Sequence, residues 1–232
     1  EMQRSLVGSE MCIRDRFNYI RKNKIKVVWT QHDCWSFTGH CAYFDAIGCE
    51  KWKTGCYSCK QLKTYPAAYV DSSKKNWIDK KNLFSGLDIQ IVTPCRWLSG
   101  LVKESFLGEY PVEVIYNGID DTVFSRTNRK FRIKNGIENK FMILGVASEW
   151  TERKGLKDII SLYEKLNPNN YQIVVVGLTE DQLKRIPEGI IAFQRTSNVQ
   201  ELVDIYSSAD LFFNPTYEDN FPTTNIESIA CG

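Results

Sequence analysis

The feature that most constrains the fold is a regular alternation of short, β-branched apolar runs with longer segments of helical spacing. Strand-like runs occur at 25–30, 89–93, 112–116, 141–146, 171–176, 190–193 and 211–213. Helical spacing occurs between them at 96–106, 156–166 and 199–207. Parallel strands need such crossover segments because a short turn cannot connect them. The order therefore predicts an α/β protein with doubly wound parallel sheets.

A polar stretch divides these elements into two sets. Residues 121–140 have few apolar positions and several basic residues, so they predict a linker. The elements at 17–120 would form the C-terminal part of a first Rossmann-like domain, and those at 141–232 the N-terminal part of a second. The chain ends at Gly232, partway through an expected helix, so we expect a fragment in which both domains are incomplete.

The first sixteen residues resemble a translated sequencing adaptor. Residues 1–16 show no clear helical or strand period. We therefore expect a non-native arm here and leave it out of the fold prediction, with a short natural arm as the alternative.

Charge and hydropathy exclude two classes of protein. The formal net charge is +2 and the Lys and Arg residues are scattered, so we expect no nucleic-acid partner. No apolar run approaches the roughly 18–20 residues that span a bilayer, so no transmembrane segment is expected. Peripheral contact with a membrane stays open on this reasoning.

Two acidic residues frame the most informative segment of the chain. Asp219 and Glu227 are eight positions apart, with a turn and the start of a helix between them. Thr223, Thr224 and Asn225 are candidates for the helix cap, which would place Glu227 in the first helical turn. Backbone N–H groups at a helix start suit an anion, and a carboxylate there can accept hydrogen bonds from sugar hydroxyls. The segment therefore predicts a binding site for a negatively charged, hydroxyl-rich ligand.

The segment resembles the acidic pair of retaining GT-B glycosyltransferases, and two further motifs occur in the matching order. Asn117-Gly118-Ile119-Asp120 is similar to the family's signature between its two domains. Arg153-Lys154-Gly155 is similar to the basic motif after the first strand of the donor domain. The resemblance runs from about Phe17 to Gly232 and is to family-4-type glycosyltransferases of bacterial polysaccharide assembly.

The resemblance implies a fold and an activity. The fold is GT-B, with two Rossmann-like domains. The reaction moves a hexose from a nucleoside-diphosphate sugar to a glycan or lipid-linked acceptor, with retention at the anomeric carbon. Such an enzyme works in the cytoplasm, at times bound peripherally to the inner face of the membrane, and needs no cofactor or divalent metal for catalysis.

The resemblance also implies roles for individual residues. Lys154 would contact the donor diphosphate, where a fixed cation stabilises the charge that develops on the leaving group. Glu227 would bind the ribose hydroxyls and Asp219, a catalytic candidate with Lys154, the hexose. Further donor contacts would come from Arg153, Arg195, Thr196, Asn220, Phe221, Pro222 and Thr223.

The sequence departs from the family pattern at two positions. Many members carry an arginine five residues before the motif lysine, and this chain has Glu149 there. Arg153 could substitute, although adjacent side chains on a helix point in different directions. The first acid of the pair is usually glutamate, and Asp219 would reach less far toward the sugar.

The two histidines, His32 and His40, lie in one segment. His32 directly follows the strand predicted at 25–30, where ligands collect in open α/β sheets. The family places a histidine at this strand end, facing the donor sugar, which implies a catalytic role for His32; the alternative is a residue that only packs the loop. Asp33 could orient it or serve the acceptor, and His40 or Cys34 could bind a metal ion.

Four cysteines cluster in a segment that we interpret as a loop-rich insertion at 34–60. Cys56 and Cys59 form a CxxC pair, and Cys41 and Cys49 precede them at loop-like spacing. Four such thiols can make a closed, tetrahedral structural zinc site. Free thiols are the alternative, and a reducing cytosol disfavours the third option, disulfides.

Two other functions stay open at this point. One is another GT-B enzyme, such as a nucleotide-sugar epimerase or a phosphorylase, the latter requiring a lysine-bound pyridoxal cofactor. The other is an inactive truncated remnant that binds nucleotide weakly or not at all. Binding of a nucleotide sugar by a well-folded protein would argue against the remnant.

Overall fold

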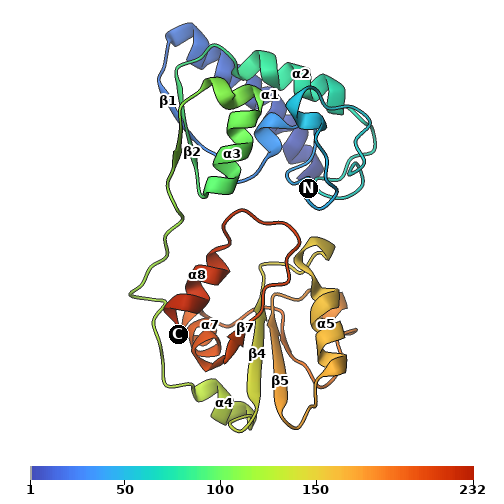
Figure 1. The fold of residues 1–232 in the computed structure, drawn as a ribbon, viewed down its shortest axis with the longest axis vertical. Coiled ribbons are helices and arrows are strands. Elements are labelled where there is room, and N and C mark those ends of the chain that lie inside the picture. Colours follow the sequence, from blue (N-terminus) through green and yellow to red (C-terminus); the bar gives the residue numbers. More distant parts are fainter. Residues whose placement is uncertain (1) are drawn as a thin grey trace. The chain divides into compact units, whose positions relative to one another are not determined.

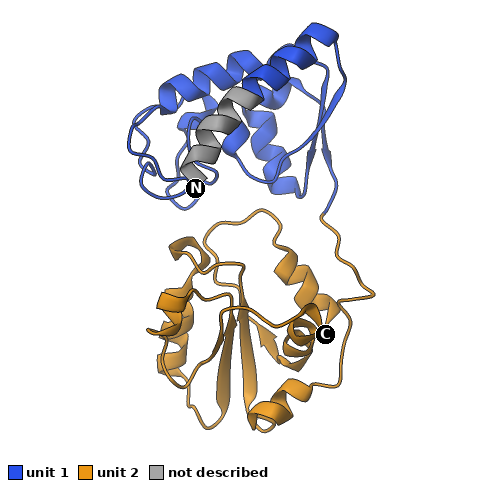
Figure 2. Cartoon of the chain, turned by 180° about the vertical axis from the view of Figure 1, so that it is seen from behind, with its two compact units in different colours: residues 1–116 blue, residues 117–232 orange. Residues whose placement is uncertain are grey.

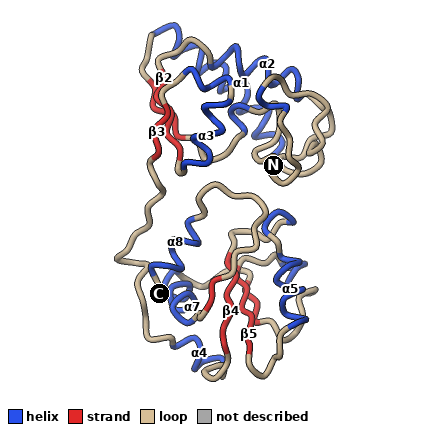
Figure 3. The backbone as a smooth tube through the Cα atoms, in the orientation of Figure 1, coloured by secondary structure: helices blue, strands red, loops and turns tan. Residues whose placement is uncertain are grey.

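The computed structural model describes the backbone of residues 2–232 and the side chains of residues 13–232. The chain splits into two compact units, Glu1–Tyr116 and Asn117–Gly232, coloured separately in Figure 2. Each unit contains a parallel sheet with helices, as the tube in Figure 3 shows, so the predicted α/β class is confirmed. Within the described part of the chain, no helix is long and apolar enough to cross a membrane.

The first unit is built on a three-stranded parallel sheet. Its strands are β1 (Val27–Thr30), β2 (Ile89–Thr93) and β3 (Val112–Val114), in the order β1-β2-β3; β1 and β2 are labelled in Figure 1. All three occur where β-branched runs predict them. β2 lies between the other two, and four of its five residues are buried. This matches the near-continuous apolar run expected of a central parallel strand.

Among the described residues of this unit, three α-helices and three short 3-10 turns accompany the sheet. The helices are α1 (Met2–Asn23), α2 (Ser73–Phe84) and α3 (Arg96–Glu104). The turns are η1 (Trp35–Phe37), η2 (Lys51–Lys53) and η3 (Phe106–Glu109). The sequence predicts only α3, because α2 is mostly polar and contributes just Trp77 and Phe84 as large buried apolar side chains.

The N-terminal segment differs from the sequence prediction. Residues 1–16 show no helical period, whereas the structure places most of them in α1. Phe17 of α1 packs against Phe84 and Trp29, with ring centroids 4.6 and 5.3 Å apart, and Arg14 pairs with Asp79 at 3.2 Å. The helix is therefore anchored by a few tertiary contacts near its C-terminal half, which a search for periodicity does not detect.

The second unit has a four-stranded parallel sheet in the order β6-β5-β4-β7. The strands are β4 (Phe141–Val146), β5 (Tyr171–Val176), β6 (Ile191–Phe193) and β7 (Leu211–Phe212). Alternate residues of β4 and β5 enter different cores, since Met142 and Leu144 belong to one cluster and Ile143 and Ile173 to the other. Both faces of this sheet are therefore covered, as a doubly wound fold requires.

Helices cover each face of this sheet. On one face lies α5 (Leu156–Lys165), preceded by the turn η4 (Glu152–Lys154), and on the other lies α7 (Val199–Ser208), as Figure 1 shows. The remaining helices are α4 (Lys130–Asn135), α6 (Glu180–Leu183) and α8 (Thr223–Ala230). The sequence predicts α5, α7 and the start of α8, but it does not predict the short helices α4 and α6.

The segment predicted as a linker is partly folded. Within 121–140, helix α4 buries Phe131 in the core of the second unit, and Ile137 is buried there as well. The Arg132 guanidinium donates to the Ser208 carbonyl at 2.6 Å and pairs with Asp210. Arg132 is charged, yet its bonds hold the segment against the second unit. Composition alone therefore does not show that the second unit begins before residue 141.

Gly177, directly after β5, is a position where only glycine fits. Its φ is +103°, and a Cβ there would lie 1.8 Å from the Ala147 carbonyl oxygen. We expect Gly177→Ala to lower the free energy of unfolding by at least about 2 kcal/mol, because it adds backbone strain and a steric clash. Chemical unfolding of the chain, followed by circular dichroism, measures this loss.

Gly118→Ala is the matched control for this prediction. Gly118 has no positive φ and open space around its Cα, so its substitution should change stability by no more than about 0.5 kcal/mol. Equal effects of the two substitutions would contradict the packing argument.

Candidate functional site

The predicted lysine and the predicted first acid meet in the structure. Lys154 ends the turn that follows β4, and Asp219 lies in the loop that follows β7. Because β4 and β7 are neighbouring parallel strands, both connections leave the same, carboxyl edge of the sheet. There the Lys154 ammonium donates to the Asp219 carboxylate, with 2.5 Å between Nζ and Oδ2.

Backbone contacts fix the loop that carries Asp219. The Tyr217 amide donates to the Arg153 carbonyl at 2.9 Å, and the Arg153 guanidinium donates to the Glu218 carbonyl. Gly155, in the left-handed region with φ +77°, brings the backbone against Pro215, whose carbonyl oxygen would lie 2.4 Å from an added Cβ. The basic motif, residues 153–155, is thus bound at several points to the loop at 215–219, which we call the acidic loop.

The ion pair is largely shielded from water. The side chains of Lys154 and Asp219 are 19% and 17% exposed, whereas Lys157, on the next helix, is 83% exposed. Partial burial strengthens the attraction between opposite charges because water screens them less. A cation held in this way at the carboxyl edge of a sheet can bind a second anion, such as a phosphate, with little rearrangement of its side chain.

Glu227 is held from a different element. Helix α8 presents it to α7, where the Tyr206 hydroxyl donates to the Glu227 carboxylate at 2.9 Å. Burial and the neighbouring Glu227 charge raise the pKa of Tyr206 well above its usual range. Tyr206 therefore keeps its proton at any ordinary pH and fixes one carboxylate oxygen of Glu227.

The start of α8 differs from the sequence prediction. Its N-cap residue is Pro222, which makes no side-chain cap, rather than Thr223, Thr224 or Asn225. The Asn225 side chain accepts instead from Asn214 at 2.9 Å. Because the helix begins at residue 223, Glu227 lies just beyond the first turn and not within it.

The other predicted donor contacts are arranged around this loop or farther along the sheet. Asn220 donates its amide to Asp219 at 2.9 Å, and Phe221 accepts from the Asn117 side chain at 3.1 Å. Arg195 and Thr196 follow β6, which is separated from β4 by β5. They lie at the same carboxyl edge but two strands away from Lys154.

His32 belongs to the first unit, where it is exposed in the loop after β1. Neighbouring Asp33 accepts the Trp35 amide at 2.8 Å, and burial raises the pKa of Asp33 despite that bond. This loop is held by Lys80 of α2, which is buried and donates to the carbonyls of Trp35 and Thr38 at 2.6 and 3.0 Å. These bonds fix the backbone next to Asp33, and the roles expected for His32 and Asp33 stay predictions.

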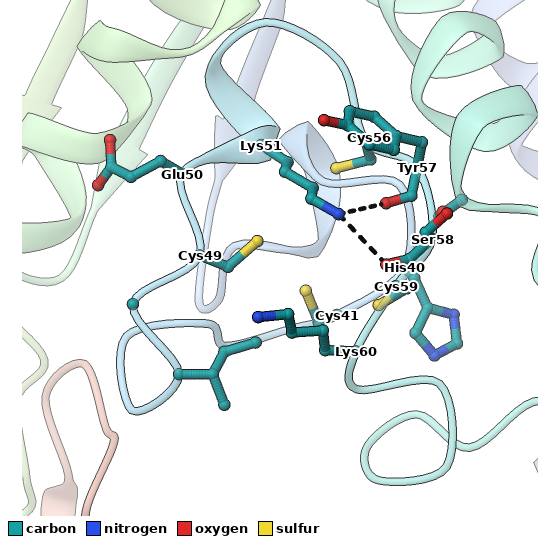
Figure 4. A pocket seen from close by; sticks show the side chains of 13 residues that line it. His40, Cys41, Cys49, Glu50, Lys51, Cys56, Tyr57, Ser58, Cys59 and Lys60 are labelled. Carbon is teal, nitrogen blue, oxygen red and sulfur yellow. Dashed lines mark hydrogen bonds between the residues drawn. The ribbon is translucent and has the colours of Figure 1, made fainter.

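The four clustered cysteines line one pocket of the first unit, together with His40 (Figure 4). All are free thiols. Burial, followed by the charges of Cys59 and Cys56, raises the pKa of Cys41 to about 12, and burial also raises the pKa of Cys56 and Cys59. As they stand, no three His, Cys, Asp or Glu side chains within the described residues are set to hold a metal ion.

Comparison with known proteins finds matches over the unit that carries the ion pair. Residues 127–232 match the family of glycosyl transferases group 1. The chain is 38% identical over 102 residues to WcaC of Escherichia coli (strain K12), whose name places it in colanic acid biosynthesis as a glycosyl transferase; the match covers 43% of this chain and 24% of WcaC. It is 30% identical over 107 residues to the alpha-galactosylglucosyldiacylglycerol synthase of Streptococcus pneumoniae (strain ATCC BAA-255 / R6), covering 40% of this chain and 27% of that protein. The chain thus spans about a quarter of the length of these relatives.

Solved structures extend the likeness to both units. HepE of Anabaena, determined with UDP, aligns with 94% of this chain and 55% of its own, at a TM-score of 0.64 and 13% identity. Sucrose-phosphate synthase from Thermosynechococcus elongatus aligns with 76% of this chain and 45% of its own, at a TM-score of 0.58 and 15% identity. A glycosyltransferase from Rickettsia africae aligns with 94% of this chain and 59% of its own, at a TM-score of 0.54 and 16% identity. The fold is GT-B, and residues 127–232 of the second unit match the glycosyl transferases group 1 family.

Two residues of these sites have no signal in the sequence. Tyr206 lies within an apolar helical pattern and is indistinguishable there from a core residue. Lys80 lies in a lysine-rich helix, where a solvent-exposed role is the usual expectation. Both are recognised only once the structure shows which groups they contact.

Lys80 provides a test of how the His32 loop is held. We expect Lys80→Met to lower the free energy of unfolding by about 2–3 kcal/mol, because two buried carbonyls lose a charged donor. Hydrogen exchange of the amides at 31–41 should accelerate. Lys81→Met, the neighbouring exposed lysine, should change neither measurement, and a similar loss in both variants would contradict the assigned role.

Proposed function

We propose that this chain carries the donor site of a retaining glycosyltransferase. The enzyme transfers a hexose from a nucleoside-diphosphate sugar to a glycan or a lipid-linked acceptor during polysaccharide biosynthesis. The observation that carries the proposal is the shielded Lys154–Asp219 pair at the carboxyl edge of the second sheet. The group 1 domain, the likeness to WcaC, and neighbours solved with UDP and with UDP-glucose support it.

Lys154 would act on the leaving group. When the bond between the anomeric carbon and the diphosphate oxygen breaks, negative charge grows on the departing nucleoside diphosphate. A preorganised ammonium group next to that oxygen lowers the barrier, because the charge is stabilised without reorganising water. In the absence of donor, Asp219 holds Lys154 in place.

Asp219 and Glu227 would bind hydroxyl groups of the donor. Asp219 would accept from the hexose while it orients Lys154, and Glu227 would accept from the ribose. Tyr206 restricts the Glu227 carboxylate to one orientation through its hydrogen bond. We expect this preorganisation to lower the entropic cost of donor binding.

The departures from the family pattern leave Lys154 as the main positively charged group for the donor diphosphate. Glu149 stands where many members have an arginine and is exposed. The Arg153 guanidinium donates to the Glu218 carbonyl, so it stabilises the loop that carries Asp219. Recognition of the diphosphate therefore depends mainly on Lys154.

Calorimetric titration with UDP-, GDP- and ADP-sugars tests the proposal. One donor should bind the whole protein, and Lys154→Met should weaken it by about 10- to 100-fold, the cost of a hydrogen bond to a charged group. Binding of the corresponding nucleoside, which lacks the diphosphate, should change little. Lys157→Met, an exposed lysine three residues on, is the matched control and should bind as the unaltered protein does.

A second titration tests the role of Tyr206. We expect Tyr206→Phe to weaken the donor and its nucleoside by the same factor, about three- to tenfold, because it releases a carboxylate that contacts the ribose. Glu227→Gln should have a larger effect on both. Lack of binding by any donor to a well-folded protein would refute the proposed function, and unchanged binding in Tyr206→Phe would refute only the positioning role.

A further inference from the structure

The first unit contains a pocket whose lining is rich in sulfur. Its cavity of about 150 Å³ is lined by Cys41, Cys49, Cys56 and Cys59. Figure 4 shows their sulfur atoms around this pocket, with Cys56 and Cys59 on one CxxC turn and Cys41 and Cys49 on other parts of the loop. Of the seven described cysteines, the other three do not line it. The grouping therefore selects the four residues that form the C-x7-C-x6-C-x2-C spacing.

The chain around the pocket has little regular structure to hold it. Between residues 38 and 72, the turn η2 is the one helical element that the structure describes. Loops of this length without secondary structure are uncommon within compact domains, and those that occur are usually functional or disordered. An aromatic cluster of Phe37, Phe44 and Trp52, with centroids 5.0–6.4 Å apart, orders one side. None of the four pocket cysteines belongs to this aromatic cluster.

Backbone amides point at two of the sulfur atoms. The Gly39 amide donates to Cys56 Sγ at 3.2 Å, and the Gln61 amide donates to Cys59. An amide two residues after the second cysteine of a CxxC pair supports negative charge on its sulfur. Gly39 cannot carry a side chain here, because an added Cβ would lie 2.1 Å from the Ser73 carbonyl oxygen.

The pocket also supplies charge compensation. Lys51 and Lys60 line it, and the Lys51 ammonium donates to the Tyr57 carbonyl at 3.0 Å, within the CxxC turn. Four thiolates around a divalent cation carry a net charge of about −2. Lys51 and Lys60, set against Glu50 in the same lining, leave one positive charge that offsets part of it, and Lys51 also links its loop to the turn that bears Cys56 and Cys59.

We propose that Cys41, Cys49, Cys56 and Cys59 bind one structural zinc ion. Binding replaces four S–H bonds by four zinc–sulfur bonds and releases four protons to solvent, with no change in oxidation state. Soft thiolate ligands in a tetrahedral set favour zinc among the common divalent ions. The thiols must close on the ion, and three of the four are only half-buried. This inference is independent of the proposed function.

Metal analysis of the purified whole protein tests the proposal. We expect about one zinc ion per chain, and about one cobalt ion after stripping and reloading, with the visible absorption bands of tetrahedral cobalt thiolate. Cys56→Ser and Cys59→Ser should each lose the metal. Cys95→Ser is the matched control, because Cys95 lies outside the pocket and serine preserves its helix cap, so its metal content should not change.

Two further measurements keep the proposal falsifiable where a variant misfolds. Chelator treatment of the unaltered protein should lower the melting temperature of the first unit and leave donor binding by the second unit in place. His40→Ala should retain the metal, since four thiolates suffice. Absence of zinc and cobalt binding in reduced protein, disulfides in protein purified under reducing conditions, or metal loss in His40→Ala would each overturn the proposed ligand set.

Discussion

Parallel pairing of β4 with β7 is the interaction on which the candidate site depends. The two strands pair over only two residues each, yet this directs two connections that are distant in sequence to one edge. Lys154 and Asp219 are separated by 65 positions, and no local signal relates them. The pairing makes them neighbours, and hydrogen bonds between the Arg153 turn and the 216–219 loop then fix their spacing.

The elements that sequence predicts well are those whose apolar residues fix both period and burial. β2, β4 and β5 are runs rich in apolar residues that lie in the middle of their sheets, and their bounds agree with the structure. α2 and α4 are mostly polar, and each is held by a few buried side chains and by specific bonds of Lys80 and Arg132. Periodicity cannot reveal such elements, because their stability comes from partners elsewhere in the chain.

The candidate site divides in the same way. The chemical types of Lys154, Asp219 and Glu227 follow from motif spacing, whereas their supports do not. Tyr206 acquires its role only when α7 and α8 pack together, and Arg153 acts through a backbone carbonyl that any residue could supply. Every residue has a backbone carbonyl, so the sequence does not indicate which carbonyl Arg153 contacts. The contacts that support Asp219 and Glu227 are therefore known only from the structure.

Gly155 shows how the absence of an atom can shape a site. Its missing side chain lets the start of α5 lie against the Pro215 carbonyl, and the same residue follows the lysine in the chain. Any larger residue would push the acidic loop away from the sheet and take Asp219 out of reach of Lys154. Gly155 therefore sets the distance between the Lys154 and Asp219 charges through the close backbone approach that it permits, although it carries no charge itself.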